Sequence, residues 1–368
     1  MALTLARPSS TPSEPSDGTD DAARVLHVVA SNDRSTAAAL RDYVASTGHL
    51  EHWVLAGKDS LSSLTLPSGV RSIHIVSLPD GVRARLRAIS ETFTKVRPIR
   101  VHAHSFEAGA YVRLVCAVPT KSIVYSPHCY TFERRDISAG ARALNAFVEY
   151  LLAPRAAAVA ACSLRELHLA ARLHRTGQLV HVPHVPSNSS FESTEAPPLG
   201  QAGRIVAAIG PLTAQRDPEF FVRTLAAADP GASWIWIGDG EPRYRRLLED
   251  AGVCVTGHLP RKNMIRLLRT ADVYVHTAAW EGSCDMLLEA AATGLPIAAR
   301  SIPALRALRI AGLAQTPEAL ADTVMRMLRS PADRRIQCES FRRAFRINSR
   351  AIQSDRLCEL YGRKRRNS

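Results

Sequence analysis

Residues 272–299 read DVYVHTAAWEGSCDMLLEAAATGLPIAA, and this stretch decides the fold that we expect for the chain. Residues 272–276 are rich in β-branched and aromatic side chains and predict a buried strand. Residues 285–293 predict a helix, because a glycine and a proline that terminate helices follow directly. Residues 297–299 then return as a second buried strand. A strand, a helix and a strand in this order are typical of an open parallel sheet.

Two acidic residues, Glu281 and Glu289, flank the start of the predicted helix. In an open parallel sheet, ligands bind beyond the carboxyl ends of the strands, where the free N–H groups of the next helix face anions. The loop over residues 282–285 is therefore a candidate phosphate cradle, and both carboxylates can accept hydrogen bonds from sugar hydroxyls. The alternative is that both are solvated acids beside a helix N-terminus, which favours negative charge by itself.

Length and composition indicate two domains and no membrane-spanning segment. The chain has 368 residues and 46% hydrophobic content, enough to bury two cores. It contains no run of eighteen apolar residues, and its first residues are rich in Pro, Ser, Thr and Asp, unlike a signal peptide. Its seven cysteines are scattered and lack Cys-x2-Cys spacing, which indicates neither a disulfide framework nor a zinc site. We expect a cytoplasmic protein with reduced, mostly buried thiols.

The formal net charge of +13 raises the question of an anionic partner. Only five of the 47 basic residues are lysine, and this arginine bias together with abundant alanine is typical of a GC-rich genome. The basic residues lack the interleaved aromatic side chains of a nucleic-acid platform, so nucleic acid is not expected as a partner. Residues 83–100 and 363–366 are candidate contacts with an acidic membrane surface, the alternative being a solvated helix face and a basic terminus.

Strand and helix patterns alternate along the whole chain, as they do in doubly wound sheets. Residues 183–203 carry no periodicity and indicate a linker between two such halves. We predict strands at residues 25–30, 53–56, 73–76, 99–103, 122–125, 156–161 and 179–182 of the first half, and at 204–209, 233–237, 253–256, 272–276 and 297–299 of the second. We expect a disordered leader (1–22), a first domain (23–186), a linker (187–202), a second domain (203–345), and a C-terminal helix with a basic tail (346–368).

Residues 281–289 resemble the Glu-x7-Glu motif of retaining GT-B glycosyltransferases, especially glycosyltransferase family 4. Residues 204–223 are similar to the strand, glycine loop and basic residue that open the donor domain of that family. Residues 234–241 and 255–259 resemble its next two strands with their turns, and residues 126–128 resemble the histidine turn of its acceptor domain. The resemblance implies the GT-B fold, in which two Rossmann-like doubly wound α/β domains face a central cleft and a C-terminal helix crosses back to the first domain.

The resemblance also implies a reaction and its partners. A retaining, metal-independent enzyme of hexosyl or N-acetylhexosaminyl type would move a sugar from a UDP- or GDP-sugar donor to an acceptor hydroxyl. The acceptor would be a glycan, a glycolipid or a small molecule in the synthesis of bacterial cell-surface polysaccharide or glycolipid. The enzyme would need no cofactor and no metal, and it would work in the cytoplasm, with peripheral contact to the inner face of the membrane.

The resemblance assigns roles to individual residues. His128 would contact the transferred sugar, and Arg216 would clamp the diphosphate, since a planar guanidinium binds phosphate through two hydrogen bonds. These two residues and Glu281 form the predicted catalytic set. Arg34 and His104 are the predicted acceptor-side residues. The predicted donor-binding residues are Gly210, Gly238, Asp239, Gly257, Leu259, Gly282, Ser283, Cys284, Asp285, Met286 and Glu289.

Departures from the family pattern keep other functions open. Pro211 follows Gly210 where the family usually carries a second cation, which would suit a non-catalytic GT-B subunit or regulator. A nucleotide-sugar epimerase shares the two-domain architecture, but it usually needs acid and base carboxylates in both halves. A nicotinamide dehydrogenase is disfavoured, because no Gly-x-Gly-x-x-Gly motif follows residues 25–30.

Overall fold

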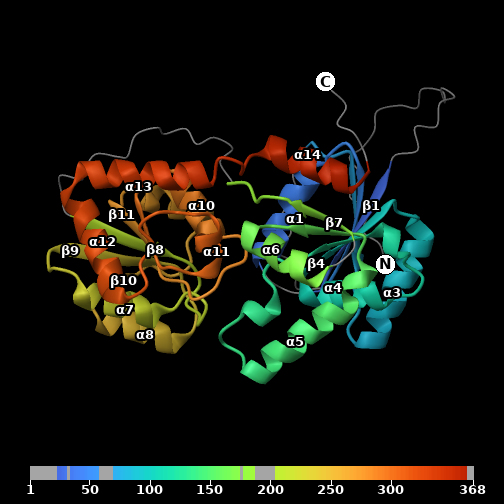
Figure 1. Ribbon diagram of the computed structural model, residues 1–368, viewed down its shortest axis with the longest axis horizontal. Coiled ribbons are helices and arrows are strands. Elements are labelled where there is room, and N and C mark those ends of the chain that lie inside the picture. The colour runs from blue at the N-terminus through green and yellow to red at the C-terminus, as the bar shows by residue number, and fades with distance from the viewer. Residues whose placement is uncertain (1–22, 31–33, 58–68, 175–176, 187–203, 363–368) are drawn as a thin grey trace. The chain divides into compact units, whose positions relative to one another are not determined.

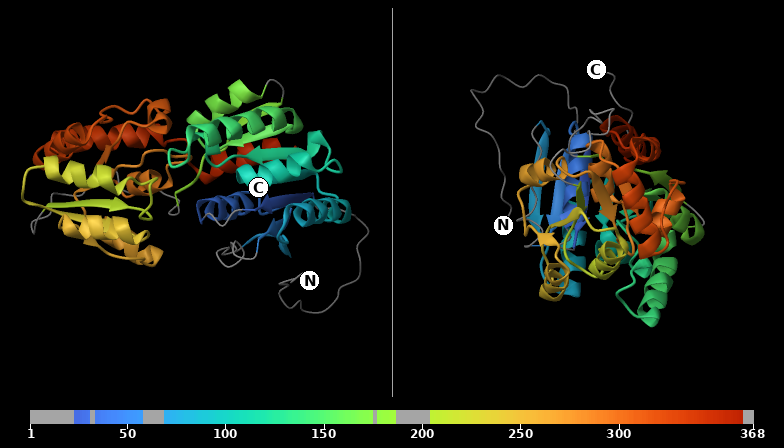
Figure 2. Two further views of the ribbon diagram at one scale, coloured as in Figure 1. Left: turned by 90° about the horizontal axis from the view of Figure 1, so that it is seen from below. Right: turned by 90° about the vertical axis from the view of Figure 1, so that its left-hand side faces the viewer.

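The computed structural model describes residues 23–30, 34–57, 69–174, 177–186 and 204–362 (Figure 1). The chain divides into two compact units: unit 1 comprises residues 1–132, 143–184 and 350–368, and unit 2 comprises 133–142 and 185–349. Each unit holds one parallel sheet with helices on both faces, as Figures 1 and 2 show, which confirms the predicted doubly wound α/β fold. The expected leader, linker and basic tail lie outside the described residues.

The sheet of unit 1 has seven parallel strands in the order β3-β2-β1-β4-β5-β6-β7. The central strands are buried along almost their whole length, because a parallel sheet is covered on both faces. The order places β4 beside β1, so residues far apart in sequence become neighbours on one face of the sheet. The strands are β1 (Arg24–Val29), β2 (Glu51–Ala56), β3 (Ser72–Ser77), β4 (Arg100–His104), β5 (Ile123–Ser126), β6 (Ala158–Ala161) and β7 (Gln178–His181).

The last helix of the chain, α14 (Arg350–Leu360), packs against α1 (Arg34–Ser46) within unit 1. Ser46 Oγ donates to Gln353 Oε1 at 2.6 Å, and Gln353 Nε2 donates to the carbonyl of Pro183 at 2.9 Å. The C-terminal helix is thus part of the first core. The other helices of this unit are α3 (Val82–Val96), α4 (Ser105–Leu114) and α6 (Leu164–Leu173), together with α5 (Ala139–Leu152) from residue 143 onward; short 3-10 turns lie at Thr120–Ser122, Thr131–Glu133 and Ala153–Arg155.

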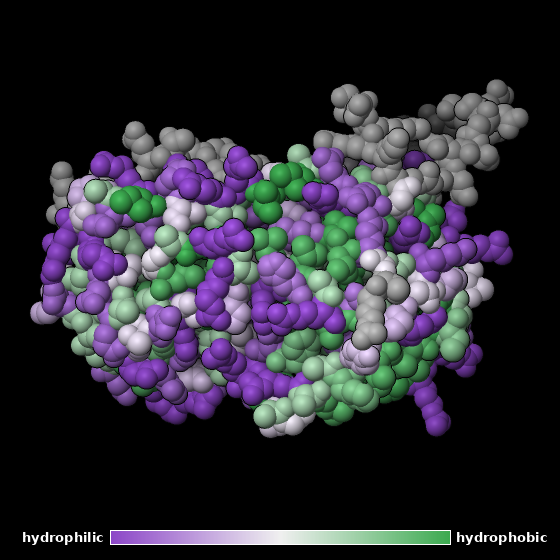
Figure 3. Space-filling model, viewed as in Figure 1, coloured by the Kyte–Doolittle hydropathy of each residue, from purple (hydrophilic) through white to green (hydrophobic). Residues whose placement is uncertain are grey.

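Helix α5 turns a charged residue inward and apolar residues outward. Glu149 is fully buried, where it accepts hydrogen bonds from Arg113 at 2.9 Å and from the hydroxyl of Tyr125 at 2.5 Å. Apolar surface gathers along α5 at the lower right of Figure 3. Among the described residues, no helix is long and apolar enough to cross a bilayer. The large side chains more than half exposed on this helix are Leu144, Phe147, Tyr150 and Leu151.

The sheet of unit 2 has five parallel strands in the order β10-β9-β8-β11-β12. Phe221 packs edge-on against Trp234 and Trp236, with ring centroids 5.3 and 5.2 Å apart, and fills the core on one face. The strands are β8 (Arg204–Ile209), β9 (Ala232–Ile237), β10 (Cys254–Val255), β11 (Val273–His276) and β12 (Ile297–Ala299). The helices are α7 (Pro218–Ala227), α8 (Pro242–Asp250), α9 (Arg261–Leu268), α10 (Asp285–Ala292), α11 (Pro303–Ala307), α12 (Pro317–Arg329) and α13 (Pro331–Ala344).

Candidate functional site

Two glycines allow the loops at the carboxyl ends of β8 and β9 to pack closely. Gly210 has φ 146°, and a Cβ added there would lie 2.9 Å from Nε of Arg216. A Cβ on Gly238 would collide with the carbonyl oxygen of Gly210, which also accepts a hydrogen bond from Trp236 Nε1 at 2.9 Å. Two of the predicted donor-binding glycines therefore allow the loops after β8 and β9 to touch, and they place the Arg216 guanidinium at the sheet edge.

Arg216 and Glu281 form a buried ion pair at this edge. His276, at the end of β11, lies with Nε2 3.5 Å from Glu281 Oε1, and its Nδ1 lies 3.3 Å from the hydroxyl of Tyr274. Burial opposes the charge of Arg216, but Glu281 and further negative groups outweigh it and raise the pKa of the guanidinium. Burial, and then the charge of Arg216, hold the pKa of His276 well below its usual value. The site thus contains one fixed cation and a neutral histidine.

The Nε atom of Arg216 is buried and has no hydrogen-bond partner within the described part of the chain. Buried donors in folded proteins almost always find an acceptor, so this N–H group is available to one that a ligand brings. The backbone around it is tied down by three further bonds. Thr277 Oγ1 donates to the carbonyl of Arg216 at 2.7 Å, Ala279 N–H donates to the carbonyl of Gln215 at 2.8 Å, and Gln215 Nε2 donates to the carbonyl of Trp280 at 3.1 Å.

The two glutamates of the predicted motif are both buried, with 8% of Glu281 and 7% of Glu289 exposed. This burial excludes the alternative in which both are solvated acids. Gly282 and Ser283 lie in the loop before α10, and Cys284 takes the left-handed conformation, φ 59°, at the position before the helix. Asp285 begins α10, Met286 packs partly buried against the core, and Glu289 follows one turn later. The elements that the sequence predicted around this loop are therefore present.

The turns after β9 and β10 hold the remaining predicted donor residues. Asp239 accepts a hydrogen bond from Gly240 N–H at 2.9 Å and forms a 2.8 Å ion pair with Arg245. Gly257 has φ 73°, a conformation that glycine adopts without strain, and Leu259 packs partly buried against the second core. The carboxylate of Asp239 thus supports its own turn. No contact seen here assigns these residues a ligand, so their donor-binding role stays a prediction.

In unit 1, His128 follows β5 in a strained turn. His128 has φ 52° and Cys129 has φ 94°, and two consecutive left-handed residues other than glycine need strong support. The buried carboxylate of Glu166 provides part of it by accepting 2.7 Å hydrogen bonds from the N–H groups of Cys129 and Cys162. The His128 ring provides another part, with Nε2 3.0 Å from Nδ1 of His104.

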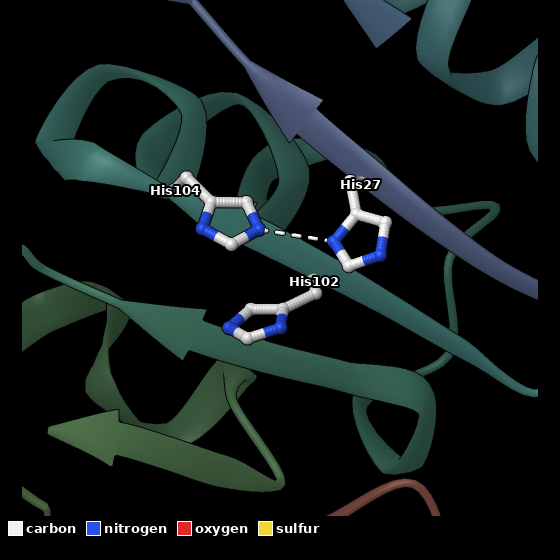
Figure 4. Close-up of side chains that lie close together, drawn as sticks. All are labelled: His27, His102 and His104. Atoms are coloured by element: carbon white, nitrogen blue, oxygen red, sulfur yellow. Dashed lines mark hydrogen bonds between the residues drawn. The ribbon is translucent and has the colours of Figure 1, made fainter. Parts of the chain in front are cut away.

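The two predicted acceptor-side residues have different positions. His104 is fully buried, and its link to the sheet edge is the hydrogen bond to His128. Helix α1 begins at Arg34, whose side chain lies outside the described structure. Figure 4 shows that His104 on β4 also meets His27 on β1, with His102 beside them.

Sequence reasoning did not select His27, His52 or Glu166 as functional residues. The signal for His27 was its interruption of an otherwise apolar strand. Glu166 follows Ser163 by three residues, which is the spacing of a capping box, and Ser163 Oγ indeed accepts a hydrogen bond from Glu166 N–H at the start of α6. Nothing in the local pattern of His52 indicated a partner.

The site of unit 2 lies within a stretch that matches a known family model. Residues 203–330 match the domain model described as glycosyl transferases group 1. This domain contains Arg216, Glu281 and Glu289, and it covers every predicted donor-binding residue. No curated protein sequence matches the chain.

Solved structures match the chain over almost its whole length. Sucrose-phosphate synthase from Thermosynechococcus elongatus superposes with a TM-score of 0.75 at 17% identity, covering 92% of this chain and 98% of that one. HepE from Anabaena, in complex with UDP and glucose, gives a TM-score of 0.74 at 15% identity, covering 92% and 99%. The lipopolysaccharide outer core galactosyltransferase WaaB gives 0.65 at 14% identity, covering 92% and 98%. At these identities the likeness establishes the shared GT-B fold.

Proposed function

We propose that the protein is a retaining glycosyltransferase of family 4 type that moves a sugar from a nucleoside-diphosphate donor to an acceptor hydroxyl. The observation that carries this proposal is the buried Arg216 guanidinium, which is fixed by Glu281 beside the start of α10 and holds an unused N–H donor. The group 1 glycosyl transferase domain around it supports the same reaction.

The chemistry requires stabilisation of a departing diphosphate, which gains negative charge as the bond to the sugar breaks. Arg216 would bind the diphosphate, and the N–H groups at the start of α10 would add their partial positive charge. This arrangement needs neither a metal nor a cofactor. Glu281 would orient Arg216 and, with Glu289, accept hydrogen bonds from donor hydroxyls. In unit 1, the proposed role of His128 is contact with the transferred sugar.

A UDP-sugar of hexosyl or N-acetylhexosaminyl type is the donor that we propose, in line with the UDP and glucose named for the HepE complex. The acceptor would be a bacterial cell-surface glycan or a glycolipid, as WaaB is a galactosyltransferase of lipopolysaccharide. We place the enzyme in the cytoplasm with peripheral contact to the inner membrane face. The exposed basic residues Arg83, Lys95 and Arg97 and the apolar outward face of α5 support that contact.

The test combines nucleotide binding with turnover. UDP should raise the melting temperature of the protein, because a ligand that binds only the folded chain stabilises it. Release of UDP from a UDP-sugar should fall about 100-fold or more in Arg216→Ala. Arg329→Ala is the matched control, since Arg329 forms an exposed ion pair with Asp229 on the same domain. Unchanged turnover in Arg216→Ala would remove Arg216 from the mechanism.

Pro211 favours a second candidate, a GT-B protein that binds nucleotide without turnover. Here the second cation of the usual clamp is replaced by a residue that has neither a charge nor a backbone N–H. UDP binding with no release of UDP from any UDP-sugar, and none after Pro211→Arg, would support this regulator or subunit. Recovery of turnover in Pro211→Arg would show instead that only one cation was missing.

A further inference from the structure

Buried histidines form an unbroken hydrogen-bonded chain in the core of unit 1. His52 Nδ1 lies 3.1 Å from His27 Nε2, and His27 Nδ1 lies 3.1 Å from His104 Nε2. His104 Nδ1 then lies 3.0 Å from His128 Nε2. The first three of these side chains are fully buried, and the chain crosses the sheet from β2 through β1 and β4 to the turn after β5. It ends at the one residue of unit 1 that the proposed function places at the sugar.

One backbone carbonyl fixes the direction of the whole chain. His52 Nε2 lies 3.0 Å from the carbonyl oxygen of Thr47, which can only accept, so Nε2 must carry the proton. Nδ1 of a neutral His52 then accepts, and His27 must donate from Nε2. His27 Nδ1 therefore accepts from His104 Nε2, and His104 Nδ1 accepts from His128 Nε2. All four rings therefore carry their proton on Nε2, and Nδ1 of His128 has none.

The surroundings keep the rings of His27, His52 and His104 neutral. Burial, and then neighbouring histidines, hold the pKa of His27 and of His104 well below the usual value. Burial lowers the pKa of His52 to about 4, although the bond to the carbonyl of Thr47 raises it. A cationic ring would donate from both nitrogens and would break the sequence of donors and acceptors.

His102 lies against this chain but is not a link in it. Ser126 Oγ donates to the carbonyl of Ala160 at 2.9 Å, so it accepts from His102 Nε2 at 2.8 Å. His102 Nδ1 then accepts from the hydroxyl of Tyr361 at 2.8 Å. Both nitrogens of His102 are thus used outside the chain, which makes it a control residue of the same type and the same burial.

The same geometry argues against a metal centre at this place. Ligand atoms of His27, His102 and His104 lie within 4.8 Å of one another, which would suit a metal ion. However, the rings of His102 and His104 stack, with centroids 4.2 Å apart and planes at 28°, whereas metal ligands converge through their edges. Figure 4 shows His102 lying beside the bonded pair of His27 and His104.

We propose that His52, His27 and His104 are positioning residues, which hold the ring of His128 and its left-handed turn in one orientation and one tautomer. The direction is set at the carbonyl of Thr47, four hydrogen bonds away from His128. The consequence for catalysis rests on the proposed function, whereas the tautomers do not. Glu166 holds the neighbouring N–H of Cys129 independently, so the strained turn is clamped from two sides.

The experiment is nitrogen NMR of the full-length protein labelled with 15N-histidine, which distinguishes protonated from unprotonated ring nitrogens. His128 is assigned from the signal missing in His128→Gln. In the unaltered protein we expect the four chain histidines to be neutral, with the proton on Nε2. A proton on Nδ1 of any of them, a charged ring at neutral pH, or bound zinc with both His27 Nδ1 and His104 Nε2 unprotonated would overturn the proposal.

Substitution of His52 tests the direction. His52→Leu removes the acceptor for His27, so the direction of donation along the chain can reverse, and the proton of His128 should move from Nε2 to Nδ1. His52→Asn keeps an oxygen near the position of Nδ1, so the tautomer of His128 should be unchanged. His102→Leu should leave it unchanged as well. A tautomer of His128 that responds equally to His52→Leu and His102→Leu, or to neither, would contradict a directed chain.

Kinetics then test the consequence. His52→Leu should lower kcat for the UDP-sugar about tenfold or more while KM stays within about twofold, and His52→Asn should restore kcat. Equal loss in His52→Leu and His52→Asn would indicate a packing effect and would overturn the positioning role. If the unaltered protein releases no UDP from any donor, the proposed function fails, but the tautomers still decide whether the chain exists.

Discussion

The side chains of Arg216 and Glu281 each depend on the other, because both charges are removed from water. The side chain of Arg216 is 14% exposed and that of Glu281 is 6% exposed. Breaking a buried pair leaves an uncompensated charge, which costs much more than the pair itself contributes. A diphosphate that reaches Nε of Arg216 would supply a second counter-charge. Stability and ligand binding are therefore coupled at this residue.

Replacement of Glu281 by Gln tests the coupling between stability and ligand binding at Arg216. We expect Glu281→Gln to lower the free energy of unfolding by about 3 kcal/mol, measured by urea denaturation, because Arg216 stays buried without its carboxylate. Saturating UDP should restore more stability in the variant than in the unaltered protein. Glu249→Gln, which removes an exposed ion pair with Arg245, should change the free energy of unfolding far less, because water and salt screen this pair. If UDP stabilised Glu281→Gln and the unaltered protein equally, Arg216 would not contact the phosphates of UDP.

Buried histidines should make the protein sensitive to mild acid. Burial lowers the pKa of His52, His174 and His181 from 6.5 to about 4. The unfolded chain then binds protons more readily, so the stability is complete above pH 6.5 and is lost as the pH falls toward 4. Each residue accounts for about 3 kcal/mol over that window. Urea denaturation between pH 7 and 4.5 measures the slope, which should become shallower in His52→Asn. An unchanged slope would mean that His52 is already accessible to protons.

The site residues that could be predicted from the sequence are those that belong to a pattern within one short segment. Arg216, Glu281 and Glu289 lie in turns and helix starts with a recognisable spacing, and the structure brings Arg216 to Glu281. His52 and His27 have no such local pattern. Their hydrogen bonds form only because β2, β1 and β4 are neighbours in the sheet, and no single segment of the sequence determines that strand order.

At the scale of elements, the sequence pattern located the predicted strands of the described chain, and the helix predicted over residues 285–293, to within one or two residues. The exceptions have local causes. Helix α11 is only five residues long, too short to show a period. Helices α13 and α14 are separate and break near the predicted domain boundary at residue 346, where no glycine or proline marks the break. The glycine turns at strand ends were predicted as turns, but their close mutual contact was not.

That contact predicts a specific sensitivity. Gly238→Ala should lower the free energy of unfolding by about 2–4 kcal/mol, because the new Cβ meets the carbonyl of Gly210 and the backbone has φ 146°. UDP binding should weaken as well, since the displaced loop carries Arg216. Gly140→Ala on α5 is the control: a Cβ there meets nothing within 4 Å, and alanine favours the helix. Chemical denaturation and calorimetric titration measure the two effects. Similar stability of both variants would show that the loops after β8 and β9 can separate.

At the scale of the whole molecule, the sequence predicted two doubly wound sheets, and each unit confirms this. Tyr361, at the end of the chain, donates to His102 in the first core, and Arg100 Nε donates to the carbonyl of Leu360 at 3.0 Å. These contacts join residues more than 250 positions apart, and no local pattern could have predicted them. Helix α14 and Tyr361 therefore complete the core of unit 1.

The surface of the whole molecule predicts binding to anionic membranes. The net charge of +13 would attract acidic lipids, and Phe147, 57% exposed, and Leu151, 55% exposed, on the outward face of α5 would enter the acyl boundary. The protein should sediment with phosphatidylglycerol vesicles and much less with phosphatidylcholine vesicles. Phe147→Ser with Leu151→Ser should remove the part of this binding that survives high salt, because that part is apolar. Ile336→Ser, which removes a 65% exposed apolar residue from α13, should change nothing. Salt-resistant binding that persists in the double variant would exclude α5 as the contact.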